Sequence, residues 1–299
     1  MNANIVLNPG VKQKDPSRAL VIAVSSHAMF ELGGELKLHL QKVKQEPEPK
    51  STVKDNEPFR EGIAFPFIKA VQQVNKKLLE KNANEMLLFD VILFSNDVSP
   101  ASQSRVVNSA LHYDLEIGRF CFCSDKDFAA SLQSNHVKLF LSTDTDEVGK
   151  ALKEGFPAAL LYQQRGQGTT DTLRVLFSGD VLGFSDDMAH FLREQGFSEP
   201  QLQSISTAKG AMKEFATVIG EMRRRFGREG SPLCTCLVTV WTPRDACAGA
   251  LKMLRGWGLE VDEAFCLAGA PQSPILAQIQ PHILYDHGLH NARNVPAQC

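Results

Sequence analysis

The strongest constraint on the fold is a series of short apolar segments that alternate with amphipathic segments along the chain. Residues 19–24 (ALVIAV) and 89–94 (FDVILF) are apolar, rich in β-branched side chains and followed directly by Ser. Between them, residues 65–79 carry apolar side chains at helical spacing. Short apolar strands separated by amphipathic helices are typical of a parallel sheet covered on both faces. The sequence therefore predicts the α/β fold class.

The same alternation continues to the end of the chain and gives a two-part organisation. Further strands are predicted at residues 137–141, 158–162, 173–177, 233–239, 264–268 and 283–285, and further helices at 188–195, 209–226 and 245–257. A polar, Gly- and Thr-rich stretch at 163–172 is predicted to join the two parts. We expect a tail at 1–17, an N-terminal α/β half at 18–165 with an exposed, Pro-containing insertion at 41–61, and a core at 173–299.

Composition excludes several classes of protein. The chain has 299 residues, enough for about two domains, and 32 Lys and Arg against 34 Asp and Glu give a net charge of -2. Near-neutrality does not favour a nucleic-acid partner, and no apolar run approaches the roughly 20 residues that cross a bilayer. Seven cysteines, an odd number, make a poor disulfide framework and are expected to be reduced, mostly buried thiols. We expect a cytoplasmic protein with no membrane contact.

Chemistry is expected where the strands end, because ligands of such sheets bind at the carboxyl ends of the strands. No nucleotide-binding glycine loop follows a strand, and no H-E-x-x-H zinc motif occurs. The two histidines of DHGLH (286–290) favour an exposed loop over a metal site. Four strand ends of the second half do form an ordered series: FSGD (177–180), LVT (237–239), GAPQSP (269–274) and LYDH (284–287).

This series resembles the motif order of the haloacid dehalogenase-like phosphohydrolases. Within that superfamily, the chain closely resembles the cytosolic 5'-nucleotidases of type I from about residue 18 to residue 287. The segments that carry the resemblance are AVSSHAMF (23–30), FPFIKAVQQVN (65–75), VVNSALHYDLEIGRFC (106–121), GFSDD (183–187), LRGWGLEVDEAFCLAGAP (254–271) and IQPHILYD (279–286). The resemblance implies a Rossmannoid α/β core and Mg²⁺-dependent hydrolysis of nucleoside monophosphates, notably AMP.

The resemblance also implies roles for single residues. Asp180 would be the acid/base and a magnesium ligand, Thr239 the hydroxyl that holds the phosphate, and Asp286 a second magnesium ligand. Ser178 stands where the family has its nucleophilic Asp, and Gln272 where it has the phosphate-binding Lys. A serine hydroxyl is a weak nucleophile without an activating base, and it brings no charge to magnesium. Magnesium affinity and turnover are therefore expected to be reduced.

Two hypotheses follow from these departures. The first is a cytosolic 5'-nucleotidase with weak or absent activity, in which Asp186 or Asp187 are the nearest other acids that could attack phosphorus. The second is a non-catalytic, nucleotide-binding or regulatory relative that assembles with an active paralogue. A homo-oligomer or a hetero-oligomer is compatible with either hypothesis.

Overall fold

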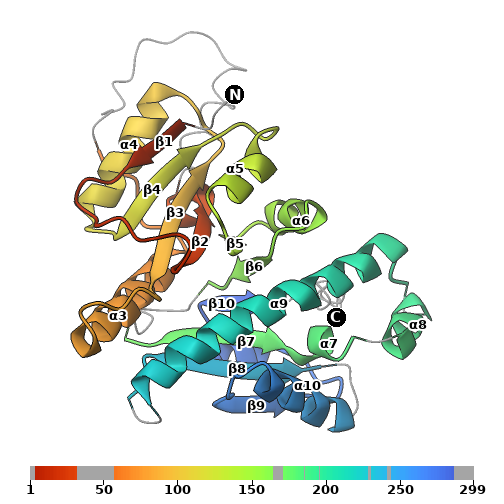
Figure 1. Cartoon of the computed structure of the whole chain (residues 1–299). Coiled ribbons are helices and arrows are strands. Elements are labelled where there is room, and N and C mark those ends of the chain that lie inside the picture. The colour runs from red at the N-terminus through yellow and green to blue at the C-terminus, as the bar shows by residue number, and fades with distance from the viewer. Residues whose placement is uncertain are drawn as a thin grey trace, which may run out of the picture.

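The computed structural model describes residues 4–31, 57–163, 171–184, 186–194, 196–227, 230–240 and 244–285. Within these ranges one sheet runs through the whole molecule (Figure 1). Its strands in chain order are β1 (Asn4–Leu7), β2 (Leu20–Ser25), β3 (Phe89–Ser95), β4 (Ile117–Phe122), β5 (Leu139–Ser142), β6 (Ala158–Leu161), β7 (Leu173–Ser178), β8 (Leu233–Thr239), β9 (Glu263–Cys266) and β10 (Ile283–Tyr285).

The sheet has the order β1-β4-β3-β2-β5-β6-β10-β7-β8-β9. Strands β4, β3, β2, β5 and β6 are parallel to one another, and so are β10, β7, β8 and β9. The two groups meet at β6 and β10, which pair antiparallel. The carboxyl ends of the strands in the N-terminal half therefore lie at the opposite edge of the sheet from those in the C-terminal half.

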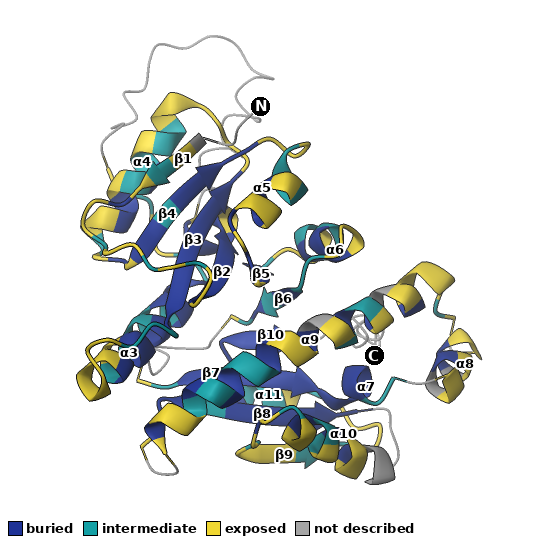
Figure 2. Cartoon of the chain, viewed as in Figure 1, coloured by how far each residue is buried: buried dark blue, intermediate teal, exposed yellow. Residues whose placement is uncertain are grey.

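Helices cover both faces of this sheet, and their outer surfaces are exposed while the central strands are buried (Figure 2). The edge strand β9 is largely exposed. The helices are α1 (Ser26–Met29), α3 (Phe65–Lys81), α4 (Pro100–His112), α5 (Phe128–Ser134), α6 (Thr145–Lys153), α7 (Gly179–Leu182), α8 (Asp186–Glu194), α9 (Glu199–Phe226), α10 (Arg244–Gly256) and α11 (Ser273–Ile279).

Alternating side chains of the strands supply the core on the two faces. The largest apolar cluster contains Ile22 of β2, Val175 of β7 and side chains of α3, α4 and α9, so it continues across the junction of the two halves. On the other face, Val21 of β2 packs with α5 and α6 in one cluster, and Leu176 of β7 packs with α11 in another. The α/β fold class is confirmed, and the mostly parallel sheet is consistent with a haloacid dehalogenase-like core.

The structure differs from the sequence expectations at the tail, at the insertion and at the start of α9. Residues 4–7, inside the expected tail, form β1, which pairs antiparallel with β4 at the sheet edge. Of the expected exposed insertion, residues 41–56 lie outside the described ranges, and Phe59 is half-buried against the main core. Helix α9 begins at Glu199, ten residues before its predicted start, because Ser198 and Gln201 form a capping box there.

The structure also bears on the cysteines and on membrane-spanning helices. Cys121, Cys123, Cys236 and Cys247 are buried free thiols, whereas Cys266 is exposed. Cys299 lies outside the described ranges. Among the helices that the structure describes, none is long and apolar enough to cross a membrane.

Candidate functional site

The candidate site lies where β7 ends, between its two parallel neighbours β10 and β8. Ser178 is the last residue of β7 and the N-cap of α7, and its Oγ accepts a long, 3.4 Å hydrogen bond from the N–H of Val181. A cap of this kind satisfies one of the free N–H groups at the start of a helix. The Ser178 side chain is buried, so its position is fixed by the turn that follows the strand.

Asp180 lies two residues further on and is joined to the neighbouring strand. Its Oδ2 accepts a 2.8 Å hydrogen bond from the backbone N–H of Val240, and the side chain is fully buried at 0% exposure. The residue between them has to be glycine. A Cβ on Gly179 would lie 2.0 Å from Cγ2 of Thr239, which is closer than atoms can pack. This close approach brings Ser178, Asp180 and Thr239 to one place, as the strand-end argument predicted.

The loop after β9 joins the same place through backbone hydrogen bonds. The N–H of Leu267 donates to the carbonyl of Thr239 over 2.8 Å, and that of Gly269 donates to the carbonyl of Val240 over 2.6 Å. Gln272 follows on this loop as the N-cap of α11. Its Nε2 atom is buried and has no hydrogen-bond partner in the described part of the chain. The position expected to hold the phosphate-binding Lys thus carries a neutral donor with no partner among the described residues.

The last expected site residue, Asp286, lies outside the described residues, as do His287 and His290. Tyr285, directly before it, pairs with Phe177 of β7, and the two rings stack with centroids 5.8 Å apart. Full burial raises the pKa of the Tyr285 hydroxyl, whose oxygen has no hydrogen-bond partner among the described residues. Aromatic packing therefore fixes the end of β10 next to Ser178.

The family resemblance implies a bound Mg²⁺ ion, which needs several oxygen ligands from the site. Magnesium binds oxygen ligands, above all carboxylates, and retains several waters. In the described ranges the site supplies one carboxylate, Asp180, of which one oxygen already accepts the Val240 N–H. The described ranges also contain no group of three or more His, Cys, Asp or Glu side chains that could hold a metal. Asp186 and Asp187 are exposed at the start of α8. The described residues alone therefore do not make a magnesium site.

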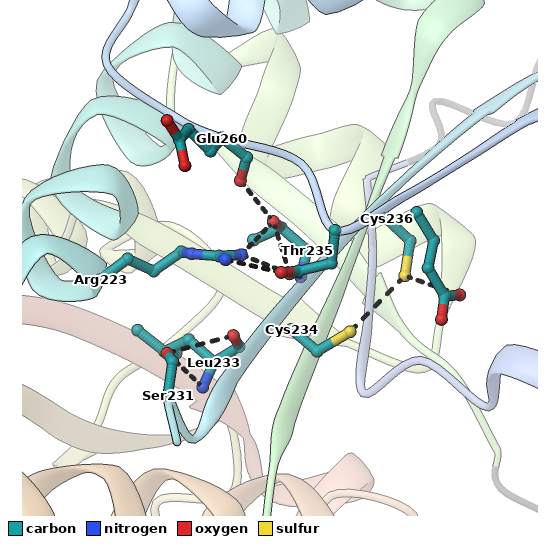
Figure 3. A network of polar contacts seen from close by, with 9 residues as sticks. Arg223, Ser231, Leu233, Cys234, Thr235, Cys236 and Glu260 are labelled. Carbon is teal, nitrogen blue, oxygen red and sulfur yellow. Dashed lines mark hydrogen bonds and ion pairs between the residues drawn. The ribbon is translucent and has the colours of Figure 1, made fainter. Parts of the chain in front are cut away.

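The opposite end of β8 is anchored by a polar network (Figure 3). The guanidinium of Arg223, on α9, forms a bidentate ion pair with Asp262, and its Nη1 also donates to Oγ1 of Thr235 over 2.6 Å. The N–H of Thr235 donates to Asp262 over 2.7 Å. Burial works against the Asp262 charge, but the hydrogen bonds from Arg223 and Thr235 outweigh it and hold its pKa below the usual value. The network fixes β8 against α9 and thereby fixes the strand that ends in Thr239.

Comparisons with known proteins identify the family of the chain. A family model described as 5'-nucleotidase matches residues 12–297. The chain is also 36% identical over 287 residues to human cytosolic 5'-nucleotidase 1B. The chain belongs to the cytosolic 5'-nucleotidase I family. The match covers 92% of this chain and 47% of the human protein, so the chain spans about half the length of that relative. No solved structure matches the chain significantly.

Membership of the 5'-nucleotidase family confirms the resemblance seen in the sequence, whereas the roles of the single residues stay predictions. Sequence reasoning missed Val240, whose backbone N–H is the partner of Asp180. No side-chain signal marks such a residue, because the group that acts belongs to the backbone. The need for glycine at position 179 was likewise not noticed, although it stands between the two residues singled out as catalytic.

Proposed function

We propose that this chain is a cytoplasmic, nucleotide-binding member of the cytosolic 5'-nucleotidase I family with weak or absent phosphatase turnover. The observation that carries the proposal is Ser178 at the end of β7, two residues before the buried Asp180. In the family reaction, as the resemblance implies it, the carboxylate at the position of Ser178 attacks the phosphorus of a nucleoside monophosphate. The Ser178 hydroxyl oxygen accepts a hydrogen bond from the first turn of α7, and in the described part of the chain no base is hydrogen-bonded to it.

The magnitudes favour loss of turnover over a mild defect. Removing the nucleophile of a hydrolase that forms a covalent intermediate costs on the order of a millionfold in turnover, or about 8 kcal/mol. Replacing Lys by Gln272 removes up to about 4 kcal/mol of charge attraction to a phosphate oxygen about 4 Å away, before screening and desolvation. The two losses overlap and do not add. Either one is enough to stop normal turnover.

Other features of the site support retained binding. Asp180 is held at the end of β7, Thr239 ends the neighbouring strand β8, and Gln272 offers a buried donor that has no partner among the described residues. A buried donor without a partner gains most from a ligand oxygen that satisfies it. Magnesium would have Asp180 and Asp286 as carboxylate ligands, with reduced affinity because Ser178 supplies no charge.

Two measurements on the full chain test the proposal. AMP with magnesium is expected to raise the melting temperature, while release of phosphate stays at the rate of a buffer control. The double variant Ser178→Asp, Gln272→Lys is expected to gain phosphatase activity, and the same variant with Asp180→Asn is expected to lose that gain. Turnover by the unmodified chain at the rate of an ordinary phosphatase would overturn the proposal.

The regulatory alternative has its own outcome. If millimolar AMP leaves the melting temperature unchanged, nucleotide binding is excluded. The chain would then be expected to act through assembly. Co-purification with a catalytically active 5'-nucleotidase, measured by size-exclusion chromatography with light scattering, would detect that role.

A further inference from the structure

The two outermost strands of the sheet differ in how they are protected from pairing with another strand. The sheet ends in β1 on one side and in β9 on the other (Figure 1). An outermost strand presents free N–H and C=O groups, and proteins usually protect it with charged side chains or proline. β9 carries the exposed acidic residue Glu263. Residues 4–8 (NIVLN), which contain β1, include neither a charged residue nor proline. The strand β1 therefore lacks these two forms of protection.

Two large apolar side chains lie exposed on β1. Ile5 is 43% exposed, and Leu7, at 56%, is more exposed than any other large apolar side chain in the described ranges. They are two residues apart on one strand, so they lie on the same face of the sheet. Val6, between them, packs against the main core on the other face. An apolar pair is thus left uncovered on the outermost strand.

The backbone of β1 is arranged to accept a further strand. The N–H of Asn8 donates to the carbonyl of Gly118 over 3.0 Å, so these two residues form a hydrogen-bonded pair that continues the antiparallel register of β1 with β4. Hydrogen-bonded and non-hydrogen-bonded pairs alternate along such a ladder. The backbone groups of Val6 therefore point to β4. Those of Ile5 and Leu7 point away from β4, to the open side of the strand.

A second copy of β1 fits this open side when the two strands run antiparallel about a two-fold axis through Val6. Val6 then lies opposite its own copy, and Ile5 lies opposite Leu7 of the second copy. The residues whose backbone groups point outwards are paired with each other, so each Ile5–Leu7 pair exchanges two hydrogen bonds. Side chains directly opposite each other share a face, so the exposed apolar side chains also meet. One register satisfies both requirements and brings no like charges within β1 together.

We propose that β1 is a self-association strand, through which two copies of this chain pair antiparallel and join their sheets into one. A two-fold contact uses the same surface on both copies and closes on itself, so the expected species is a dimer. One strand from each copy is small beside the roughly 1,600 Å² of a standard interface, so the dimer is expected to be reversible. The proposal does not depend on nucleotide binding beside Ser178.

Trapping with introduced cysteines tests the register. In the proposed ladder the two copies of Val6 form a non-hydrogen-bonded pair with Cα atoms about 4.5 Å apart, a separation that a disulfide spans. The two copies of Ile5 would lie about 8 Å apart, from the strand spacing and the rise per residue, which is too far. Val6→Cys is therefore expected to form a linked dimer under mild oxidation of the full chain. Ile5→Cys, at the more exposed position, is the matched control and is expected not to.

Non-reducing electrophoresis reads the linked dimer, and mass spectrometry of peptides shows that the link joins the introduced cysteines and not natural ones. Circular dichroism verifies the fold of both variants. Linking of Ile5→Cys as efficient as that of Val6→Cys, or absence of a linked Val6→Cys dimer, would overturn the proposal.

Sedimentation velocity tests the association without cross-linking. The dimer fraction of the unmodified chain is expected to rise with concentration. Leu7→Lys disrupts both Ile5–Leu7 pairs and places a charge on the outermost strand, so it should weaken association roughly tenfold. Leu79→Lys changes another exposed leucine, on α3, and should leave association unchanged. Equal effects of the two variants, or a monomer at every concentration, would contradict the proposal. Species that keep growing with concentration would show open-ended pairing and would contradict the two-fold contact.

Discussion

The carboxylate of Asp180 accepts the backbone N–H of Val240 over 2.8 Å, and this bond joins the turn after β7 to the residue that follows β8. The two strands run parallel, with Ser178 opposite Val238. Asp180 therefore has a structural task whether or not it takes part in a reaction. A variant at this position changes the strand edge as well as the chemistry.

Asp180→Ala is expected to lower the free energy of unfolding by about 1–3 kcal/mol, because the buried N–H of Val240 loses its acceptor. Asp180→Asn keeps an oxygen in the same place and should cost less. Urea denaturation of both variants measures the difference. Equal losses for the two would show that the hydrogen bond contributes little.

Gly179→Ala is expected to cost about 1–3 kcal/mol, because the added Cβ would overlap Cγ2 of Thr239. Thr239→Ser removes that methyl group and keeps the hydroxyl. The double variant should therefore recover part of the stability lost by Gly179→Ala alone. A double-mutant cycle by urea denaturation gives the coupling energy, and a value near zero would argue that the turn shifts to accommodate the methyl group.

Asp90 and Arg119 form an ion pair in the middle of the N-terminal half. They lie on neighbouring strands with Oδ2 and Nη2 2.5 Å apart, and Asp90 is 2% exposed. Asp90→Ala leaves a largely buried guanidinium without its carboxylate and should cost about 3–5 kcal/mol. Asp90→Ala together with Arg119→Met should be clearly more stable than Asp90→Ala alone. Thermal or urea unfolding tests this order, and the reverse order would contradict the assignment of a buried pair.

His282, directly before β10, predicts a dependence of stability on pH. Burial, followed by the nearby charge of Arg174, lowers its pKa from 6.5 to about 4, and its Nδ1 accepts the Arg174 N–H over 3.1 Å. Below pH 6.5 the unfolded chain binds a proton at this group, whereas the folded chain does not until about pH 4. The free energy of unfolding should therefore fall between pH 6.5 and pH 4, by at most about 1.4 kcal/mol per pH unit.

His282→Asn does not titrate in this range and should flatten that fall. Guanidinium denaturation at pH 5 and at pH 7.5 compares the variant with the unmodified chain. The same loss of stability between the two pH values in both proteins would assign the effect to other groups.

The sequence was most informative where burial leaves a continuous apolar pattern. Strands β2, β3, β7 and β8 were predicted within one residue at each end, because both of their faces are covered. Strand β4 was not predicted, since Gly118 and Arg119 interrupt its apolar run, and only the fold supplies Asp90 as the partner of that arginine. Strand β1 is four residues long and becomes a strand only by pairing with β4.

Some features of the candidate site could likewise be predicted from the sequence, and others could not. The strand ends that carry Ser178, Asp180 and Thr239 could be found from the apolar pattern of the sequence, and the family resemblance pointed to these three residues within them. The anchoring of the Gln272 loop by the backbone of Thr239 and Val240 could not be found, because backbone groups have no sequence signature. The antiparallel pairing of β6 with β10 was also not predictable, since both strands have the apolar pattern of any central strand.

Because β6 and β10 pair antiparallel, the strands of the two halves end at opposite edges of the sheet. Parallel pairing of β6 with β10 would have placed the loops after the strands of both halves at one edge of the sheet, where ligands would compete for space. Here the proposed nucleotide site beside Ser178 lies at the opposite edge of the sheet from the carboxyl ends of β2 and β3. A substitution in the loops at one edge of the sheet therefore leaves the loops at the other edge out of reach of direct contact.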